Sequence, residues 1–269
     1  FFKDVENHLE NFFKVILNIT KIYQKYFIIL VESDSKDNTY VKSKNYLNKL
    51  HGKLFKVNTS KYSHRTERLS LCRNKYLDFI KKNKILKKYD HLIAMDSDSI
   101  NNLINSKKII KAISDAPRDW AGIFPSQTFS YYDLWTLRIP KVFPYDCYQK
   151  LIQISKKIGP KKAYDKIIFK NFFLVNKIKK RYIRVDSAWG GMGIYRISKI
   201  LHSKYNSKKG RFCEIVHFNK KIISKNSKLY IDKNMKNSLG LNEHFLKGFV
   251  YKNSNYFSKK LIEKAKKVF

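Results

Sequence analysis

A short apolar run that ends in two carboxylates constrains this chain more than any other feature. Residues 91–95, His-Leu-Ile-Ala-Met, have the length and composition of a buried β-strand, and Asp96-Ser97-Asp98 follows directly. Because open α/β sheets bind ligands at the carboxyl ends of their strands, this pattern predicts Asp96 and Asp98 at the rim of a sheet. Two carboxylates one residue apart could hold Mn²⁺ or Mg²⁺ and leave coordination positions for substrate phosphates. The alternative is a polar turn after a strand.

A second run of strand length lies upstream, at residues 26–31. The polar loop 32–39 follows it, and the pattern over residues 40–50 predicts the helix that this loop opens. Strand, loop and helix form the repeating unit of nucleotide-binding α/β folds. Because the loop lacks the glycines of a phosphate cradle, Glu32 and Asp34 suit a ribose and the edge of a uracil or guanine base better than a phosphate.

Taken together, these segments resemble glycosyltransferases of the GT-A fold. Residues 31–39, Val-Glu-Ser-Asp-Ser-Lys-Asp-Asn-Thr, are similar to the nucleotide loop of these enzymes, and residues 93–98 are similar to their metal-binding strand end. Residues 65–74 resemble the arginine-rich helix of the branch related to fungal capsule-associated mannosyltransferases and their bacterial and viral relatives. Three later motifs recur in the order found in that branch: residues 131–138, residues 187–195 and Cys213-Glu214. The resemblance spans roughly residues 1–245.

The resemblance implies an α/β chain with a single GT-A domain over residues 1–269. Its nucleotide-sugar-binding half would be residues 1–116, its acceptor-side half residues 117–250, and a basic C-terminal helix residues 251–269. A helical pattern begins at Val5, and in the family the equivalent helix follows the first strand of the sheet. We therefore expect that strand to be missing ahead of Phe1, leaving an exposed sheet edge or an unfilled strand position.

The resemblance also implies a donor site. Asp98 would bind the metal directly and Asp96 directly or through water, while Glu32, Asp34 and the 65–74 helix would contact the base and ribose. Arg68 and Arg73 would offset the diphosphate charge. The turn at Gly190-Gly191 would lie beside the donor sugar, since paired glycines permit a close backbone approach.

The acceptor side is expected in the second half of the chain. The sequence of residues 117–144 predicts a loop-rich, aromatic region, in which Tyr132 and Trp135 are candidate sugar contacts, with core packing as the alternative. Glu214, at a strand or helix edge, is the candidate catalytic carboxylate that accepts a proton from the acceptor hydroxyl. The sequence has Cys213-Glu214-Ile215 where relatives often have Cys-Glu-His, so His217 and His244 both compete for a third metal position; His244 is preferred.

Net charge supports a rival class of function. The chain has 57 Lys and Arg against 21 Asp and Glu, a net charge of +36, which is typical of nucleic-acid-binding proteins. Only nine of the basic residues are arginine, however, and the lysines are spread from end to end, as in a chain encoded by an AT-rich genome. Carboxylates at two strand ends would also repel phosphate, so no specific nucleic-acid partner is expected.

The predicted function is a metal-dependent glycosyltransferase that moves a sugar from a GDP- or UDP-sugar to a hydroxyl of a glycan or glycolipid. The alternatives are a catalytically inactive relative and a basic nucleic-acid-binding module; a nucleotidyltransferase would be expected to have a glycine-rich phosphate loop. Three widely spaced cysteines and the lack of a membrane-spanning apolar run predict a cytoplasmic protein. The basic tail, residues 259–267, could contact an anionic membrane peripherally or pack on the body.

Overall fold

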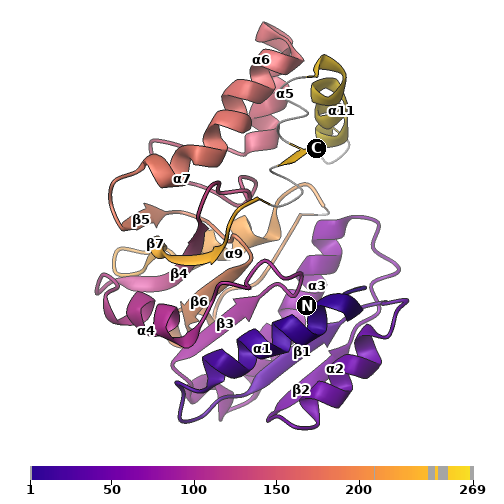
Figure 1. Ribbon diagram of the computed structural model, residues 1–269, viewed down its shortest axis with the longest axis vertical. Coiled ribbons are helices and arrows are strands. Elements are labelled where there is room, and N and C mark those ends of the chain that lie inside the picture. Colours follow the sequence, from indigo (N-terminus) through magenta and orange to yellow (C-terminus); the bar gives the residue numbers. More distant parts are fainter. Residues whose placement is uncertain (1, 209, 242–245, 248–253, 267–269) are drawn as a thin grey trace.

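The computed structural model describes residues 2–208, 210–241, 246–247 and 254–266. The chain forms an α/β fold in which helices flank a mixed five-stranded sheet and a smaller parallel pair of strands (Figure 1). The strands of the large sheet are, in spatial order, β3 (His91–Met95), β6 (Met192–Arg196), β4 (Trp120–Gln127), β7 (Lys228–Ser238) and β5 (Tyr182–Val185). Only β4 and β7 run parallel to each other; the other neighbouring pairs are antiparallel.

The small sheet consists of β1 (Ile28–Glu32) and β2 (Gly52–Lys56), which pair in parallel. Four of the five β1 residues are buried, as expected for an apolar strand with helices packed against it. On the edge of β1 away from β2, Phe2 makes a single parallel bridge to Glu32. Within the described residues, β1 therefore has a strand partner along one edge and a one-residue partner on the other.

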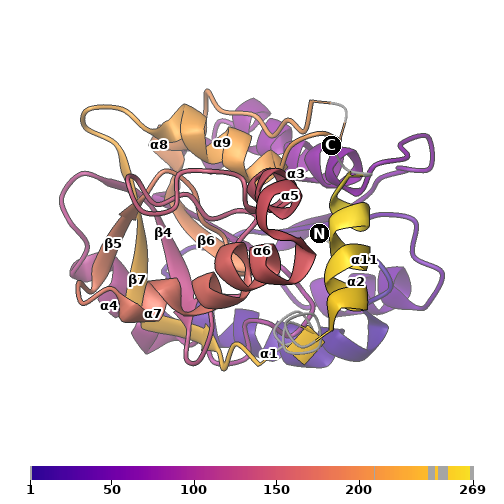
Figure 2. The ribbon, with the colours of Figure 1, turned by 90° about the horizontal axis from the view of Figure 1, so that it is seen from above.

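The helices cover the sheets and extend beyond them. The longer ones are α1 (Leu9–Thr20), α2 (Thr39–Leu47), α3 (Arg65–Lys82), α4 (Ser106–Ser114), α5 (Cys147–Ile158), α6 (Pro160–Ile167), α9 (Glu214–Ile222) and α11 (Asn255–Lys266). Short helical segments are η1 (Glu6–His8), η2 (Leu86–Lys88), η3 (Phe169–Phe173), α7 (Leu174–Lys177) and α8 (Ile197–Ile200). Helices α5, α6 and α11 pack together (Figures 1 and 2), and in Figure 1 they lie at the opposite end of the molecule from β2.

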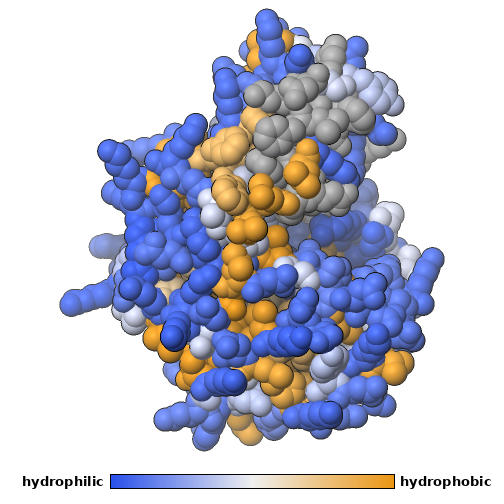
Figure 3. Space-filling model, in the orientation of Figure 1, coloured by the Kyte–Doolittle hydropathy of each residue, from blue (hydrophilic) through white to orange (hydrophobic). Residues whose placement is uncertain are grey.

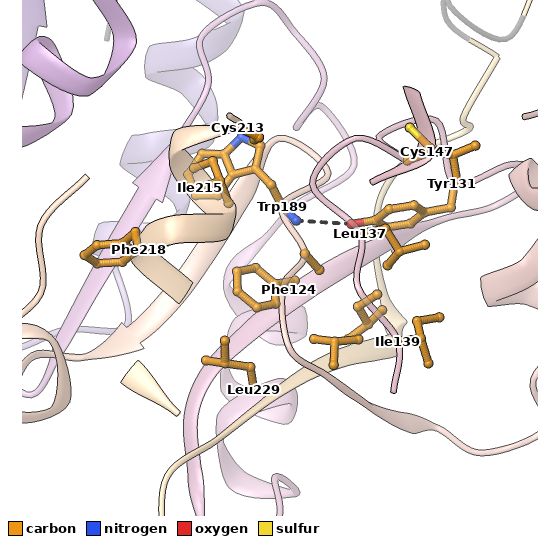
Figure 4. Close-up of a cluster of buried hydrophobic side chains, with 14 of the residues drawn as sticks. Phe124, Tyr131, Leu137, Ile139, Cys147, Trp189, Cys213, Ile215, Phe218 and Leu229 are labelled. Atoms are coloured by element: carbon orange, nitrogen blue, oxygen red, sulfur yellow. Dashed lines mark hydrogen bonds between the residues drawn. The ribbon is translucent and has the colours of Figure 1, made fainter. Parts of the chain in front are cut away.

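The largest hydrophobic core lies around the large sheet. Phe124 of β4, Leu229 of β7 and Phe218 of α9 are all fully buried in it. Figure 4 shows this cluster, in which the main-chain N–H of Trp189 donates a 3.2 Å hydrogen bond to the hydroxyl of Tyr131. The loop that carries Trp189 is thus anchored to the core before it reaches the sheet edge.

Most local predictions agree with these elements. The predicted strand at residues 91–95 is β3, the run at residues 26–31 overlaps β1, and helices occupy the predicted segments after Val5 and after residue 39. The prediction that residues 117–144 are loop-rich was wrong in part, because eight fully buried residues of this stretch form β4. Pro125 obscured the strand signal, because proline inside a strand is confined mostly to edges and bulges, and the register of β4 with β7 does shift between Phe124 and Ser126.

The surface and the cysteines agree with the composition. Figure 3 shows a face that is mostly hydrophilic, crossed by a strip of apolar side chains. All three cysteines, Cys72, Cys147 and Cys213, are buried and form no disulfide bond.

Among the described residues, no helix has the length and apolar character required to cross a membrane. In α11, Ile262 and Ala265 are buried and the helix packs on α5 and α6, so the basic tail packs on the body.

Candidate active site

Asp96 is held at the carboxyl end of β3 by contacts from three parts of the chain. Its main-chain N–H donates to the carbonyl of Gly191 at 2.8 Å, which extends the β3–β6 pairing by one residue. The indole N–H of Trp189 donates to Asp96 Oδ2 at 2.7 Å, and Arg73 Nη2 lies 3.3 Å from Asp96 Oδ1. Both carboxylate oxygens are thus engaged, although the side chain remains about one-third exposed at 31%.

Arg73, on α3, links Asp96 to a second carboxylate. Its Nη1 lies 2.9 Å from Oε1 of Glu214, and the guanidinium is also 4.7 Å from the ring of Trp189. The arginine is buried, which opposes its charge, but Glu214 and Asp96 more than offset this effect and raise its pKa. Arg73 therefore stays charged and holds two acidic side chains in fixed positions.

Glu214 begins helix α9 and is buried. The prediction placed it at a strand or helix edge facing an acceptor; it does start a helix, but its carboxylate is directed to Arg73. Burial raises the pKa of Glu214, and the charge of Arg73 opposes this shift. The side chain is therefore a partner of Arg73 and is not exposed at the rim.

Asp98 differs from Asp96, because its side chain is accessible to solvent at the rim. Nearby protein atoms nevertheless remove part of its hydration, and with the negative charge of Asp96 they raise its pKa. Tyr132 is half-buried near the same charges: desolvation and the carboxylates of Asp133, Asp96 and Asp98 all raise the pKa of its hydroxyl. Negative charge is therefore concentrated around one exposed carboxylate.

The turn at Gly190-Gly191 connects this rim to the rest of the sheet. Both residues have positive φ, +64° and +98°, and a Cβ on Gly191 would lie 2.4 Å from a methyl carbon of Ile100. The Gly190 carbonyl accepts hydrogen bonds from Asn237 at 2.6 Å and Gln127 at 3.3 Å. The glycine pair predicted from the sequence is thus required by both conformation and space.

Hydrogen bonds connect the polar loop after β1 to the segment after β2 and to the N-terminal segment. Asp34 accepts two hydrogen bonds from Thr59, at 2.8 Å from the main-chain N–H and 2.6 Å from the hydroxyl, and these lower its pKa. The carboxylate of Asp37 accepts from the main-chain N–H of Glu6 at 3.1 Å. The hydroxyl of Ser35 accepts from the main-chain N–H of Asp4, also at 3.1 Å. Most polar groups of this loop are therefore used internally.

Two side chains at the end of β1, Ser33 and Glu32, have a buried oxygen without a hydrogen-bond partner among the described residues, and only Glu32 carries a charge. It is buried, and its Oε1 accepts from the main-chain N–H of Ser35 at 2.8 Å. Its other oxygen, Oε2, is buried and has no hydrogen-bond partner among the described residues. A buried carboxylate oxygen without a donor is uncommon, and it marks this strand end as a place where a donor group is missing.

Two other predicted site residues have structural partners. Arg68 donates to the carbonyls of Tyr62 and Ser63 at 3.0 and 3.1 Å. Trp135 donates from its indole N–H to Asp146 at 3.0 Å, and Asp146 also pairs with Arg138. No contact described for either residue reaches Asp96.

Asp96 and Asp98 could supply one or two carboxylate ligands to a cation, whose remaining ligands would come from water or substrate. Within the described residues, no three His, Cys, Asp or Glu side chains are grouped to hold a metal ion. The predicted third ligand His244 lies outside the described residues, and His217 is a partly buried α9 residue whose pKa is lowered by burial. Asp96 and Asp98 fit Mg²⁺ or Mn²⁺, which commonly keep water or substrate phosphate as their remaining ligands.

Sequence reasoning missed how the site is supported. Trp189 lies in the motif at residues 187–195, but the motif does not predict its role: its indole N–H donates to Asp96, and the Arg73 guanidinium lies over its ring. No sequence motif points to His8, whose Nδ1 lies 2.8 Å from the hydroxyl of Ser99, the residue after Asp98. The only available signal was indirect: Trp189 directly precedes the glycine pair.

A comparison of the sequence with protein-family models gives no match, and a comparison with curated proteins gives none either. Since an α/β fold hosts many unrelated activities, function must be inferred here from the chemistry of the site.

Proposed function

We propose that this protein is a GT-A-type, metal-dependent glycosyltransferase that moves a sugar from a GDP- or UDP-sugar to a hydroxyl of a glycan or glycolipid. The observation that carries the proposal is the contrast between two neighbouring carboxylates. Asp96 is fixed by Trp189 and Arg73, whereas Asp98 is exposed beside it and its pKa is raised. A rigid carboxylate next to an accessible one, at the end of a strand, suits a cation shared with a phosphate ligand.

Asp98 would hold Mn²⁺ or Mg²⁺, with Asp96 as a second ligand directly or through water. The bound ion would supply positive charge to the departing nucleoside diphosphate. Desolvation and, after it, the negative charge of Asp96 raise the pKa of Asp98, and this supports the assignment because a bound cation would offset both effects. Arg73 and Glu214 then act as positioning residues for Asp96.

The nucleoside would bind at the β1 end of the site. Glu32 supports this assignment, because its unpartnered Oε2 could accept a hydrogen bond from a ribose hydroxyl or a base N–H. Arg65, at the first turn of α3, is exposed and close enough to influence Glu214 electrostatically. It is therefore a better candidate than the buried Arg73 for direct contact with the diphosphate.

On the acceptor side, Tyr132 is supported by its position among the carboxylates and Trp135 is not, since its indole N–H bonds to Asp146. The three buried free cysteines support a cytoplasmic location. The exposed lysines of α11, Lys259, Lys260 and Lys264, support peripheral contact with an anionic membrane.

A thermal-shift panel tests the proposal. UDP, GDP, CMP and their sugars are added with and without Mn²⁺; a ligand at a hundredfold excess over its Kd should stabilise the protein by ~2.7 kcal/mol. Stabilisation by one base, dependent on Mn²⁺ and lost in Asp98→Asn but kept in the surface control Asp115→Asn, is the expected result. If no nucleotide stabilises the protein, the proposal is wrong. Binding without sugar transfer would indicate the inactive alternative.

The nucleic-acid alternative, suggested by the net charge of +36, is separated by salt. Binding to duplex DNA through 6–10 phosphates would weaken by roughly 10³–10⁵ between ~50 and ~200 mM salt. Nucleotide binding held by a metal bridge would change far less over that range. Sequence-selective, salt-resistant nucleic-acid binding without any nucleotide-sugar binding would favour the alternative.

A further inference from the structure

A cavity lies at the amino end of β3, at the opposite end of this strand from the candidate active site. Its volume is about 530 Å³, and its walls come from residues 87–91, the start of β4, the end of β6, the last turn of α4 and the first turn of α8. Because a strand rises ~3.3 Å per residue, the five steps from His91 to Asp96 correspond to roughly 16 Å. The cavity is therefore a separate place in the fold.

Three side chains in the wall of this cavity stack on one another. His91 of β3 and Arg196 of β6 are directly opposite each other in the β3–β6 ladder. The ring of His91 lies 5.6 Å from the ring of Trp120, at an interplanar angle of 24°, and Cζ of Arg196 lies 4.5 Å from the centroid of the same ring. Trp120 is only 3% exposed, so its ring is covered and holds the guanidinium in place.

Arg196 differs from the other arginines that are at least partly buried. The others donate hydrogen bonds to carbonyl or carboxylate oxygens: Arg68, Arg73, Arg138 and Arg181. With the described residues, Arg196 makes the contact to Trp120 but no hydrogen bond or ion pair. Its N–H donors are therefore available to a ligand, on a guanidinium that the stacking already orients.

Positive charge dominates the lining. Lys87 and Lys88 are exposed, and neither side chain forms an ion pair with a described residue. Asp90 is the one carboxylate among the lining residues, so the three cations, Arg196 included, leave a net charge of +2. His91 adds no charge at neutral pH, because burial lowers its pKa. The lining thus favours a ligand with two negative charges.

We propose that this cavity binds a phosphorylated small molecule, with the phosphate dianion on Arg196. A planar guanidinium can donate two parallel hydrogen bonds to two oxygens of one phosphate, which a lysine ammonium cannot do. Lys87 and Lys88 add attraction for the anion, and the hydroxyl of Ser198 in the same lining is a further donor. The inference does not depend on the proposed function, because this ligand requires neither a nucleoside nor a metal ion.

The size and walls of the cavity indicate that an organic group carries the phosphate. A volume of about 530 Å³ is within the range of small-molecule sites, ~300–1,000 Å³. Ile113 of α4 and the half-buried ring of Tyr89 provide apolar contact area. The covered ring of Trp120 leaves no free face on which a nucleobase could stack. A sugar phosphate therefore suits the cavity better than a nucleotide.

Calorimetric titration with glucose 6-phosphate and with inorganic phosphate tests the site. EDTA is present, so that no metal ion is available to Asp96 and Asp98. Glucose 6-phosphate should bind one molecule per chain, more tightly than inorganic phosphate. Equal affinity for the two probes would overturn the assignment of an organic ligand, and no binding of either would overturn the site.

Substitution of Arg196 separates this site from general attraction to a basic protein. Arg196→Gln should weaken glucose 6-phosphate binding about tenfold or more, the effect of losing a hydrogen bond to a charged group. Arg196→Lys keeps the charge but not the paired donors, and should also weaken binding. The control Arg184→Gln removes the same charge from an exposed residue of β5, at the other edge of the sheet, and should have no effect. Equal weakening in Arg184→Gln would overturn the proposal.

A substitution with the opposite sign guards against effects of misfolding. Asp90→Asn removes the one carboxylate from the lining, so it should tighten glucose 6-phosphate binding by about 2–5-fold, as expected for an exposed charge. A damaged fold would weaken binding instead. Weaker binding by a folded Asp90→Asn protein, with an unchanged circular dichroism spectrum, would count against the site.

Chemical footprinting tests the location in the unsubstituted protein. Lysine acetylation is followed by mass spectrometry with and without saturating glucose 6-phosphate. Acetylation of Lys87 and Lys88 should slow when the ligand is bound, whereas that of Lys156, an exposed residue of α5, should not change. Equal protection of all three lysines, or none at Lys87 and Lys88, would overturn the proposal.

Discussion

The loop after β1 and the loop after β3 both carry carboxylates at a strand end, and they use them in opposite ways. After β1, Oδ2 of Asp34 accepts two hydrogen bonds from Thr59, and the pKa of this carboxyl is lowered. After β3, Asp98 lies exposed beside another carboxylate, and its pKa is raised. One acidic group stabilises the fold, and the other is held where its charge is unfavourable. Such an unfavourable charge is a physical indication of a binding site.

The largest effect is expected at Arg73, which supports the β3 loop. Arg73→Ala would leave Glu214 buried without its cation and remove a contact to Asp96. Breaking a buried ion pair by deleting one partner typically costs ~3–5 kcal/mol, and urea unfolding should show a loss of that size. Arg68→Ala, which removes hydrogen bonds to two carbonyls, is the control and should cost ~1 kcal/mol. A loss below ~1 kcal/mol in Arg73→Ala would contradict the buried network.

A smaller loss is expected at Asp34, in the β1 loop. Asp34→Ala deletes both hydrogen bonds to Thr59, which connect this loop to the segment after β2. Hydrogen bonds to a charged group contribute ~1.5–3 kcal/mol, so the free energy of unfolding should fall by about that amount. Unchanged stability would mean that Asp34 does not stabilise the fold and that the contrast between Asp34 and Asp98 is wrong.

Asp98→Asn should barely change stability. The side chain is exposed at the rim, and surface substitutions usually change the free energy of unfolding by less than ~0.5 kcal/mol. Since the raised pKa shows that the ionised form is disfavoured, any change should be a gain. A clear loss in urea unfolding would show that Asp98 has a structural role like that of Asp34.

The smallest effect is a difference in pH dependence. Folding lowers the pKa of Asp34, so its contribution is present above its ordinary pKa of ~3.9 and is lost as the pH falls through the lower folded value. Folding raises the pKa of Asp98, so its ionised form destabilises the protein at neutral pH, and acid relieves this. Unfolding of Asp34→Asn and Asp98→Asn from pH 7 to 3 should therefore differ from the parent in opposite directions. The same sign for both variants would break the comparison.

Local patterns predicted the parts of the site that depend on neighbouring residues. The apolar run at residues 91–95 is β3, and Gly190-Gly191 adopts the positive φ values that a glycine pair permits. The partners of Asp96 could not be predicted, because Arg73 and Glu214 meet across 141 positions of sequence. Glutamate and arginine side chains are exposed to solvent in most proteins. Only the packing of α3 against α9 buries Glu214 and Arg73 together.

The glycine turn ties the candidate site to the behaviour of the whole protein on heating. Its two carbonyls accept hydrogen bonds from the end of β3, from Gln127 of β4 and from Asn237 of β7. Through this turn, Asp96 is therefore tied to three strands of the large sheet at once. Thermal inactivation should then share its midpoint with loss of the sheet, so no temperature range should exist in which the protein is folded but its site is disordered.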